Sequence, residues 1–204
     1  MPELATLLLF AGSAATLVLI PGPNLIYIVT RSVESGRRAG LASVLGVETG
    51  TVIHVAAAAF GLSALLASSA VAFEIVKYAG VAYLIYLGVR ALRAGKAPET
   101  QIEPAGIRRT VAEGVLVNVL NPKVSLFFLA FLPQFVDPDK GSAVTQILVL
   151  GVVFLAIAAT LDLLFVVAAH LLGDRLGGGG SRRFAGGVYL ALAALAAATG
   201  GRRA

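Results

Sequence analysis

Cysteine is absent from this sequence of 204 residues, and histidine occurs only twice. Without thiols the chain can form no disulfide framework and offers no thiol nucleophile. The sequence also lacks a zinc-ligand spacing, a phosphate-binding loop, a nucleophile elbow or a dinucleotide fingerprint in a credible context. These absences argue against an enzyme, against a resident metal and against a cofactor.

Charge is scarce as well, because charged residues make up 13% of the sequence whereas 58% of it is hydrophobic. A soluble domain carries about a quarter charged residues and just under half apolar ones. The apolar residues here form runs near the ~20 residues that cross a bilayer. The basic residues behind the net charge of +5 lie in short connections between these runs, which indicates a membrane orientation and no nucleic-acid partner. The chain is therefore predicted to be an all-α integral membrane protein.

Six candidate membrane spans follow one another along the chain. They cover about 4–30, 41–67, 73–92, 111–136, 143–172 and 184–199. Lys and Arg are concentrated in the first, third and fifth connections, so we expect these odd connections to be cytoplasmic and the N-terminus to lie outside. The first run follows Met1-Pro2-Glu3 without a basic segment, so we expect no cleaved signal peptide.

The polar linker 94–110 divides a single membrane domain into two sets of three spans, 1–93 and 111–204. Because three is an odd number, the second half must cross the membrane in the opposite sense to the first. Each half also begins with a span that proline interrupts, at Pro21-Gly22-Pro23 and at Asn121-Pro122-Lys123. The sequence thus predicts two inverted three-helix repeats, and paired breaks of this kind indicate the binding site of a transporter.

Each of the prolines at the breaks removes a backbone donor and frees the carbonyl oxygen of the residue four positions earlier. In lipid, such backbone survives only where it is buried in protein or lines a polar cavity. At a rise of about 1.5 Å per residue, both breaks fall near the middle of a hydrocarbon core of about 30 Å. We therefore expect the two broken helices to meet and to enclose a site.

Three ionisable side chains, Glu48, Lys123 and Asp162, lie at a similar depth. A charge at the bilayer centre costs at least about 2.5–3.5 kcal/mol, so such a group should face the bundle interior, find a partner or stay protonated. Glu48 and Asp162 either handle substrate and protons or merely pair with Lys123 and the freed backbone. For Lys123 we expect a carboxylate partner, which is Glu48, Asp162 or the substrate itself.

Small and polar residues form stripes on the second and fourth spans. The stripe on the fourth span consists of Gly114, Asn118, Asn121 and Ser125 at helical spacing. It serves either for hydrogen bonds between helices or as the lining of a translocation path. His54 follows Gly46 and Gly50 at the same spacing, on a face suited to close packing, where it makes a structural hydrogen bond or relays a proton. Faces of this kind also permit a homodimer.

The motifs at 21–23, 46–50 with His54, 121–123 and 131–135, together with the run 77–88 in the third span, resemble those of the LysE/RhtB family of amino-acid exporters. The resemblance covers nearly the whole chain, to about Asp174, and weakens in the last helix. It implies a bacterial inner-membrane exporter of lysine-, threonine- or homoserine-like or neutral amino acids. It also implies that the membrane ion gradient drives export.

Combined with this resemblance, the residues predict a secondary active transporter that holds an amino acid between the two breaks. The candidate substrate residues are Pro21, Gly22, Pro23, Asn24, Asn118, Asn121, Pro122 and Lys123, and the candidates for proton coupling or ion pairing are Glu48, Asp162 and His54. Free N–H groups at the half-helix from Asn24, with Lys123, would bind the α-carboxylate, and asparagines and freed carbonyls would bind the ammonium. Alternating access would be a rocking of one half against the other. The alternative function is a gradient-independent channel for small polar solutes.

Overall fold

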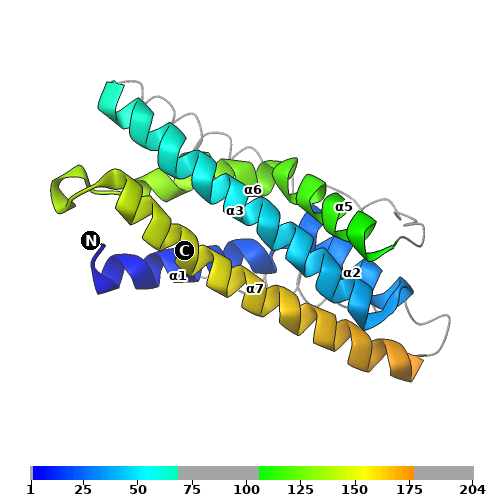
Figure 1. The fold of residues 1–204 in the computed structure, drawn as a ribbon. Helices are drawn as coiled ribbons and strands as arrows, with labels where there is room; N and C mark the ends of the chain where they lie inside the picture. The colour runs from blue at the N-terminus through cyan, green and yellow to red at the C-terminus, as the bar shows by residue number, and fades with distance from the viewer. Residues whose placement is uncertain (1, 69–105, 177–204) are drawn as a thin grey trace, which may run out of the picture.

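The computed structural model describes residues 2–68 and 106–176, and all the regular structure in these residues is helical (Figure 1). The helices run in the order α1 (Leu4–Leu19), α2 (Pro23–Glu34), α3 (Gly36–Ser68), α5 (Ile107–Val119), α6 (Pro122–Leu126), η1 (Phe127–Phe131), η2 (Leu132–Phe135), η3 (Pro138–Lys140) and α7 (Ala143–Leu176). The predicted spans 73–92 and 184–199, and most of the linker 94–110, lie outside the described residues.

Within the described part of the chain, α3 and α7 are each long and apolar enough to cross a membrane. Two bent pairs raise the number of candidate spans to four if each pair counts as one. The first pair is α1 with α2, bent by 57°, and the second is α5 with the segment Pro122–Phe135, bent by 48°. Pro23 and Pro122 are the first residues of α2 and α6, where the missing N–H of proline costs no helical hydrogen bond. The predicted proline breaks in both helices are therefore confirmed.

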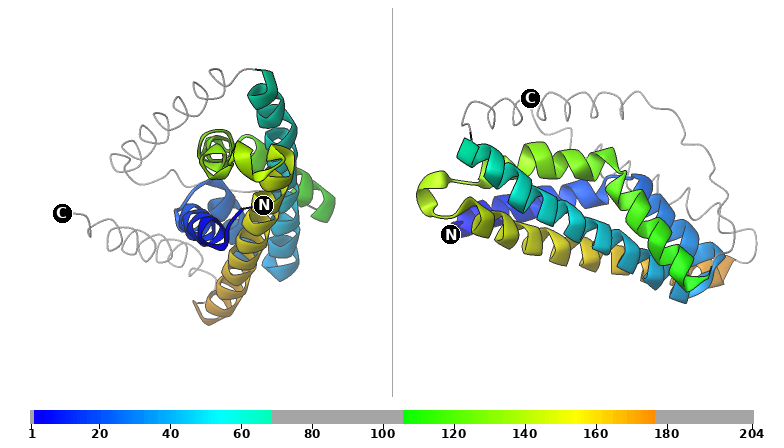
Figure 2. Two further views of the ribbon diagram at one scale, coloured as in Figure 1. Left: turned by 90° about the vertical axis from the view of Figure 1, so that its left-hand side faces the viewer. Right: turned by 45° about the horizontal axis from the view of Figure 1, so that its top comes forward.

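The long helices run along the length of the bundle, which therefore has two distinct ends, as both figures show (Figures 1 and 2). The start of α1, the end of α3 and the segment 136–142 lie at one end, which we call the Glu3 end. The ends of α2 and α7 and the start of α5 lie at the opposite end, which we call the Arg31 end. The two broken pairs therefore run in opposite directions along the bundle.

Close contact between α3 and α5 depends on glycine. A Cβ atom added to Gly114 would lie 3.0 Å from the carbonyl oxygen of Ser43 and 3.1 Å from the Cα of Gly46. A Cβ added to Gly50 would lie 2.7 Å from the Cβ of Asn118. No larger side chain fits at these positions, so the two backbones approach closely, as small residues allow in membrane helices. The small-residue stripes seen in the sequence thus pack against each other.

Aromatic side chains fill the core between the middle of the bundle and the Glu3 end. Phe127 and Phe128 are both buried, and their ring centroids lie 5.1 and 5.0 Å from that of Phe154. Phe10 of α1 lies 5.7 Å from Phe127. The two consecutive phenylalanines belong to η1, a single π-helical turn that follows the break at Pro122. Such turns often occur near functional sites because they locally change which side chains face inward.

Candidate functional site

The two helix breaks lie against each other in the middle of the bundle. The side-chain amide of Asn121 donates a hydrogen bond of 2.8 Å to the side-chain oxygen of Asn24. The oxygen of the Asn121 side chain accepts a bond of 3.0 Å from the backbone N–H of Lys123 and so caps α6. On the other side of the contact, a Cβ added to Gly22 would lie 3.1 Å from the Nζ atom of Lys123. The breaks therefore meet, as the depth estimate from the sequence predicts.

Lys123 binds the C-terminal end of α1. Its Nζ atom donates to the carbonyl oxygens of Leu17 and Ile20, at 3.0 and 2.8 Å. These carbonyls lie at the negative end of the α1 dipole, and the Leu17 carbonyl is one that Pro21 deprives of its helical partner. Of the carboxylate partners expected for Lys123, neither Glu48 nor Asp162 forms an ion pair with it in the described residues, and the substrate carboxylate stays a prediction. The unsatisfied helix end takes the ammonium instead.

His54 makes the reciprocal contact at the second break. The carbonyl oxygen of Asn118, which Pro122 deprives of its helical partner, lies 3.2 Å from the Nε2 atom of His54. Because a carbonyl only accepts, Nε2 is the donor. The imidazole also stacks on Phe128 with 5.8 Å between the ring centroids. The freed carbonyls of Leu17 and Asn118 are thus each bonded by a side chain from the other half of the sequence, and the geometry of His54 favours the structural role.

Asn118 belongs to the contact between α3 and α5. Its amide nitrogen donates to the carbonyl oxygen of Val47 at 2.6 Å and to the hydroxyl of Thr51 at 3.0 Å. The side chain is completely buried, and its Oδ1 atom has no hydrogen-bond partner among the described residues. Of the two interpretations of the stripe on the fourth span, inter-helix bonding therefore describes Asn118, whereas Asn121 reaches Asn24 at the first break.

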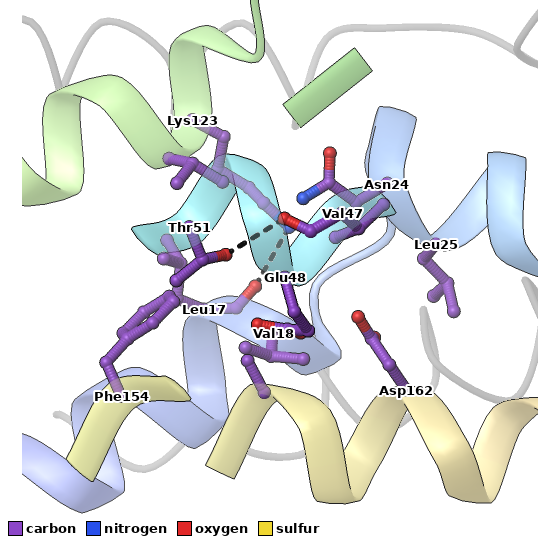
Figure 3. A pocket seen from close by; sticks show the side chains of 12 residues that line it. Leu17, Val18, Asn24, Leu25, Val47, Glu48, Thr51, Lys123, Phe154 and Asp162 are labelled. Carbon is purple, nitrogen blue, oxygen red and sulfur yellow. Dashed lines mark hydrogen bonds between the residues drawn. The ribbon is translucent and has the colours of Figure 1, made fainter. Parts of the chain in front are cut away.

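A small polar cavity lies beside the meeting breaks (Figure 3). Its polar lining consists of Asn24, Glu48, Thr51, Lys123 and Asp162, and Leu17, Val18, Leu25, Val47, Val124, Phe154 and Ala158 complete it. The cavity volume is about 20 Å³, which is room for about one water molecule. An amino acid does not fit unless the helices move apart. The structure therefore corresponds to a closed arrangement of the described residues.

Glu48 and Asp162 enter this cavity from opposite walls, Glu48 from α3 and Asp162 from α7 (Figure 3). Both carboxylate oxygens of Glu48 are buried without a hydrogen-bond partner in the described residues. Asp162 is only 4% exposed. The two side chains line the same cavity, which has room for about one water molecule. A buried charge without a partner costs free energy. Keeping these two carboxyl groups ionised in the cavity is therefore unfavourable.

The described residues contain no group of three or more His, Cys, Asp or Glu side chains able to hold a metal ion. What the cavity offers is one cation, two carboxyl groups, an amide and a hydroxyl around two helix ends. Such a set can bind the ammonium and carboxylate groups of a small zwitterion and can hold or release protons.

Residues 15–200 match the family described as LysE type translocator. The chain belongs to this family. As a LysE type translocator with long apolar helices, it is a multi-pass membrane protein of a transport class. It is 38% identical over 142 residues to a homoserine/homoserine lactone efflux protein of Salmonella typhi, an alignment that covers 69% of this chain and 68% of that protein.

Two further relatives are named only as membrane proteins. This LysE type translocator is 32% identical over 167 residues to one of Vibrio cholerae, with 79% of each chain covered. It is 33% identical over 173 residues to YrhP of Bacillus subtilis, with 79% of this chain and 81% of that protein covered. No solved structure gives a significant match.

The sequence did not predict one polar cluster of this LysE type translocator. Arg31 was assigned to a cytoplasmic connection, but α2 continues to Glu34 and Arg31 is only 2% exposed. Its guanidinium forms an ion pair with Glu113 of α5. The available signal was local: Tyr27 and Arg31, like Arg109 and Glu113, are four residues apart and share a helix face. Thr51, which lines the cavity and was not singled out, gives no comparable signal.

Proposed function

We propose that this protein is a secondary active transporter that exports amino acids across the bacterial inner membrane. The observation that carries the proposal is the meeting of two oppositely directed, broken helices beside a cavity that holds Lys123 and two buried carboxyl groups. Paired broken helices are typical of transporter sites near the bilayer midplane. The similarity to a homoserine/homoserine lactone efflux protein supports a small amino acid of the homoserine, threonine or lysine type, or a neutral one.

In this proposal, the substrate replaces the hydrogen bonds that Lys123 and the two asparagines make in the empty site. The first N–H groups of α2, at Asn24 and Leu25, have no partner within their helix and face an anion favourably. Lys123 turns from the carbonyls of Leu17 and Ile20 to the substrate carboxylate. The released carbonyls, with the Asn24–Asn121 amides, then accept the substrate ammonium.

Glu48 and Asp162 supply the coupling in this proposal. A buried carboxyl group is uncharged when protonated, and its ionised form costs free energy. Its protonation therefore responds to a proton gradient. Binding of the substrate beside the two acids displaces a proton from one of them, and release of the substrate allows a proton to return. His54 is left as a residue that supports the second break.

Alternating access follows from the same arrangement. We propose that 1–93 and 111–204 are inverted three-helix halves of one domain, joined by the linker 94–110, and that they rock about the meeting breaks. The Arg31 end carries the exposed Arg37, Arg38, Arg108 and Arg109, whereas Lys140 at the Glu3 end lies among Asp137 and Asp139. The positive-inside rule therefore supports a cytoplasmic Arg31 end and an external N-terminus.

The substrate can be identified in a bacterial host that lacks its own amino-acid exporters and is fed peptides. We expect expression of this chain to stop the accumulation of one or a few amino acids, whereas Glu48→Gln at equal protein abundance should lower their levels no further than downhill flux allows. If every amino acid accumulates to the same level with and without the chain, the proposal is contradicted.

A channel is the alternative, and reconstitution separates it from a transporter. In proteoliposomes, a coupled exporter moves the identified amino acid against its concentration gradient when a proton gradient is imposed. A channel gives the same downhill flux with and without the proton gradient. The matched control is the Glu48→Gln protein, in which we expect only the response to the gradient to be lost.

A further inference from the structure

An ion pair joins α2 to α5 near the Arg31 end of the bundle. The guanidinium of Arg31, on α2, binds the carboxylate of Glu113, on α5. Arg31 is 2% exposed, and the Glu113 side chain is 30% exposed. The hydroxyl of Tyr27 donates to the carbonyl oxygen of Thr110 at 2.7 Å and lies 3.3 Å from the Glu113 carboxylate. The Arg31 guanidinium also lies over the Tyr27 ring, 5.6 Å from its centroid.

This cluster lies between the central cavity and the Arg31 end. Arg31 follows Asn24 by seven residues in α2, a distance of about 10 Å along the helix. The space between them is filled by a buried apolar layer of Tyr27, Ile28, Val44, Val47 and Val166. Val47 lines the cavity on one side of the layer, and Tyr27 joins the ion pair on the other. Among the described residues, both the apolar layer and the ion pair lie between the cavity and this end.

Stability alone does not account for such a pair. A salt bridge with a buried partner gains little over apolar packing, because the attraction is offset by lost hydration, which here falls mainly on Arg31. The same property makes it a contact that can open, since the two charges regain water when the helices separate. Its two helices, moreover, belong to opposite halves of the sequence, so any relative rocking of the halves acts directly on it.

We propose that Arg31, Tyr27 and Glu113 form the gate that closes the transport path on the cytoplasmic side. The gate parts when α2 and α5 separate to admit substrate to the central cavity, and it closes again before the opposite side opens. This inference rests on the proposed transport function and adds to it the residues that set access. Arg109 is not part of the gate, because it pairs with Glu113 within α5 and is 66% exposed.

Accessibility of a single cysteine tests the gate without reference to any substrate. The chain contains no native cysteine, so Ala158→Cys, a small change at a cavity wall, supplies one reactive thiol in an otherwise intact protein. Membrane vesicles of both orientations are treated with a membrane-impermeant methanethiosulfonate carrying a sulfonate group. A second protein with Arg37→Cys, at an exposed position of the Arg31 end, reports which vesicles present that end to the reagent.

We expect Ala158→Cys alone to react slowly from either face, because the cavity is closed. Adding Arg31→Gln or Glu113→Gln should raise the rate from the Arg31 end about tenfold, which corresponds to about 1.4 kcal/mol less stabilisation of the closed gate. The exchanged pair Arg31→Glu with Glu113→Arg should restore slow labelling, and Arg109→Gln should leave the rate unchanged. Rates from the Glu3 end should not increase in any of these proteins.

Equal labelling from the Arg31 end in the parent and in both single variants, at equal amounts of folded protein, would overturn the gate. So would faster labelling in Arg109→Gln of the same size. If the single variants fail to accumulate in the membrane, Tyr27→Phe replaces them, since it removes only the hydroxyl bonds, and an unchanged rate in that protein counts against the proposal. If the labelling rates change as expected but the chain exports no amino acid, the proposed substrate is refuted and the proposed gate is still supported.

Discussion

Asn121 and Asn24 join the two helix breaks through one hydrogen bond of 2.8 Å that spans 97 positions of the sequence. The same Asn121 side chain caps α6 through the backbone N–H of Lys123. One amide therefore fixes the start of α6 and positions Asn24 at the edge of the central cavity. The halves of the chain are coupled at the point where the substrate is proposed to bind.

Replacing Asn121 by alanine should destabilise the protein more than replacing Asn24. Asn121→Ala loses the helix cap, worth about 0.5–2 kcal/mol, and the bond to Asn24, worth about 1 kcal/mol, whereas Asn24→Ala loses only the bond. At roughly 2–4 °C per kcal/mol for a chain of this size, the difference is measurable as the thermal unfolding midpoint in detergent. The double variant should cost no more than Asn121→Ala alone, because the bond is lost only once. Additive losses would contradict the contact.

Gly22→Ala should slow export by disturbing Lys123. Gly22 has an extended backbone that any residue can adopt, so strain is not the cause. The added methyl would lie 3.1 Å from Nζ and 3.3 Å from Cε of Lys123, which must shift by a few tenths of an ångström away from Leu17 and Ile20. Gly12→Ala is the matched control, because no atom lies within 4 Å of its added Cβ. The measurement is the initial export rate per amount of protein, and a parental rate in Gly22→Ala would show that the Lys123 contacts tolerate the shift.

Gly114→Ala should separate α3 from α5. Its methyl would press on the backbone of Ser43 and Gly46, which cannot move as a flexible side chain can. Overpacking of this kind costs about 1–3 kcal/mol and should lower the unfolding midpoint in detergent. Gly61→Ala, in the partner helix α3, meets nothing within 4 Å and should leave the midpoint unchanged or raise it slightly. Equal midpoints for the two variants would argue against a close α3–α5 contact.

Glu48→Gln and Asp162→Asn should each uncouple transport from the proton gradient. Both substitutions keep the size of the side chain but remove the group that gains and loses a proton. Exchange of labelled amino acid across the membrane at equal concentrations should persist, while accumulation driven by an imposed pH gradient should be lost. His54→Gln is the control, since its amide can still donate to the Asn118 carbonyl, and it should retain gradient-driven accumulation. Full accumulation in both carboxyl variants would exclude them as the coupling groups.

Much of the local structure was predictable because lipid imposes strong local rules. The breaks at Pro23 and Pro122 follow from the missing N–H of proline, and their equal depth follows from the helical rise. The same estimate indicated that Glu48 and Asp162 lie level with the breaks, and the cavity contains both. The close-packing face at Gly46 and Gly50 was equally visible, because only small residues let membrane helices approach.

The partners of individual side chains were not predictable in the same way. Without substrate, Lys123 binds two carbonyl oxygens of α1 and not Glu48 or Asp162. Every residue has a carbonyl, so the sequence carries no mark of this partner. Arg31 was placed in the first connection because it follows an apolar run, and its partner Glu113 is 82 positions away. A charge near the end of a span is equally compatible with the interface and with a buried ion pair.

The sequence by itself determined that the described helices are apolar, where the two broken helices are interrupted and which buried groups are costly, because these follow from composition, proline geometry and helical periodicity. Only the tertiary structure decided that Asn24 meets Asn121, that Lys123 and His54 each bond the carbonyl freed in the opposite half, and that Arg31 meets Glu113. These contacts depend on how helices distant in sequence cross and rotate against one another. That choice is made by packing over the whole bundle, at glycines such as Gly46 and Gly114, and no local pattern encodes it.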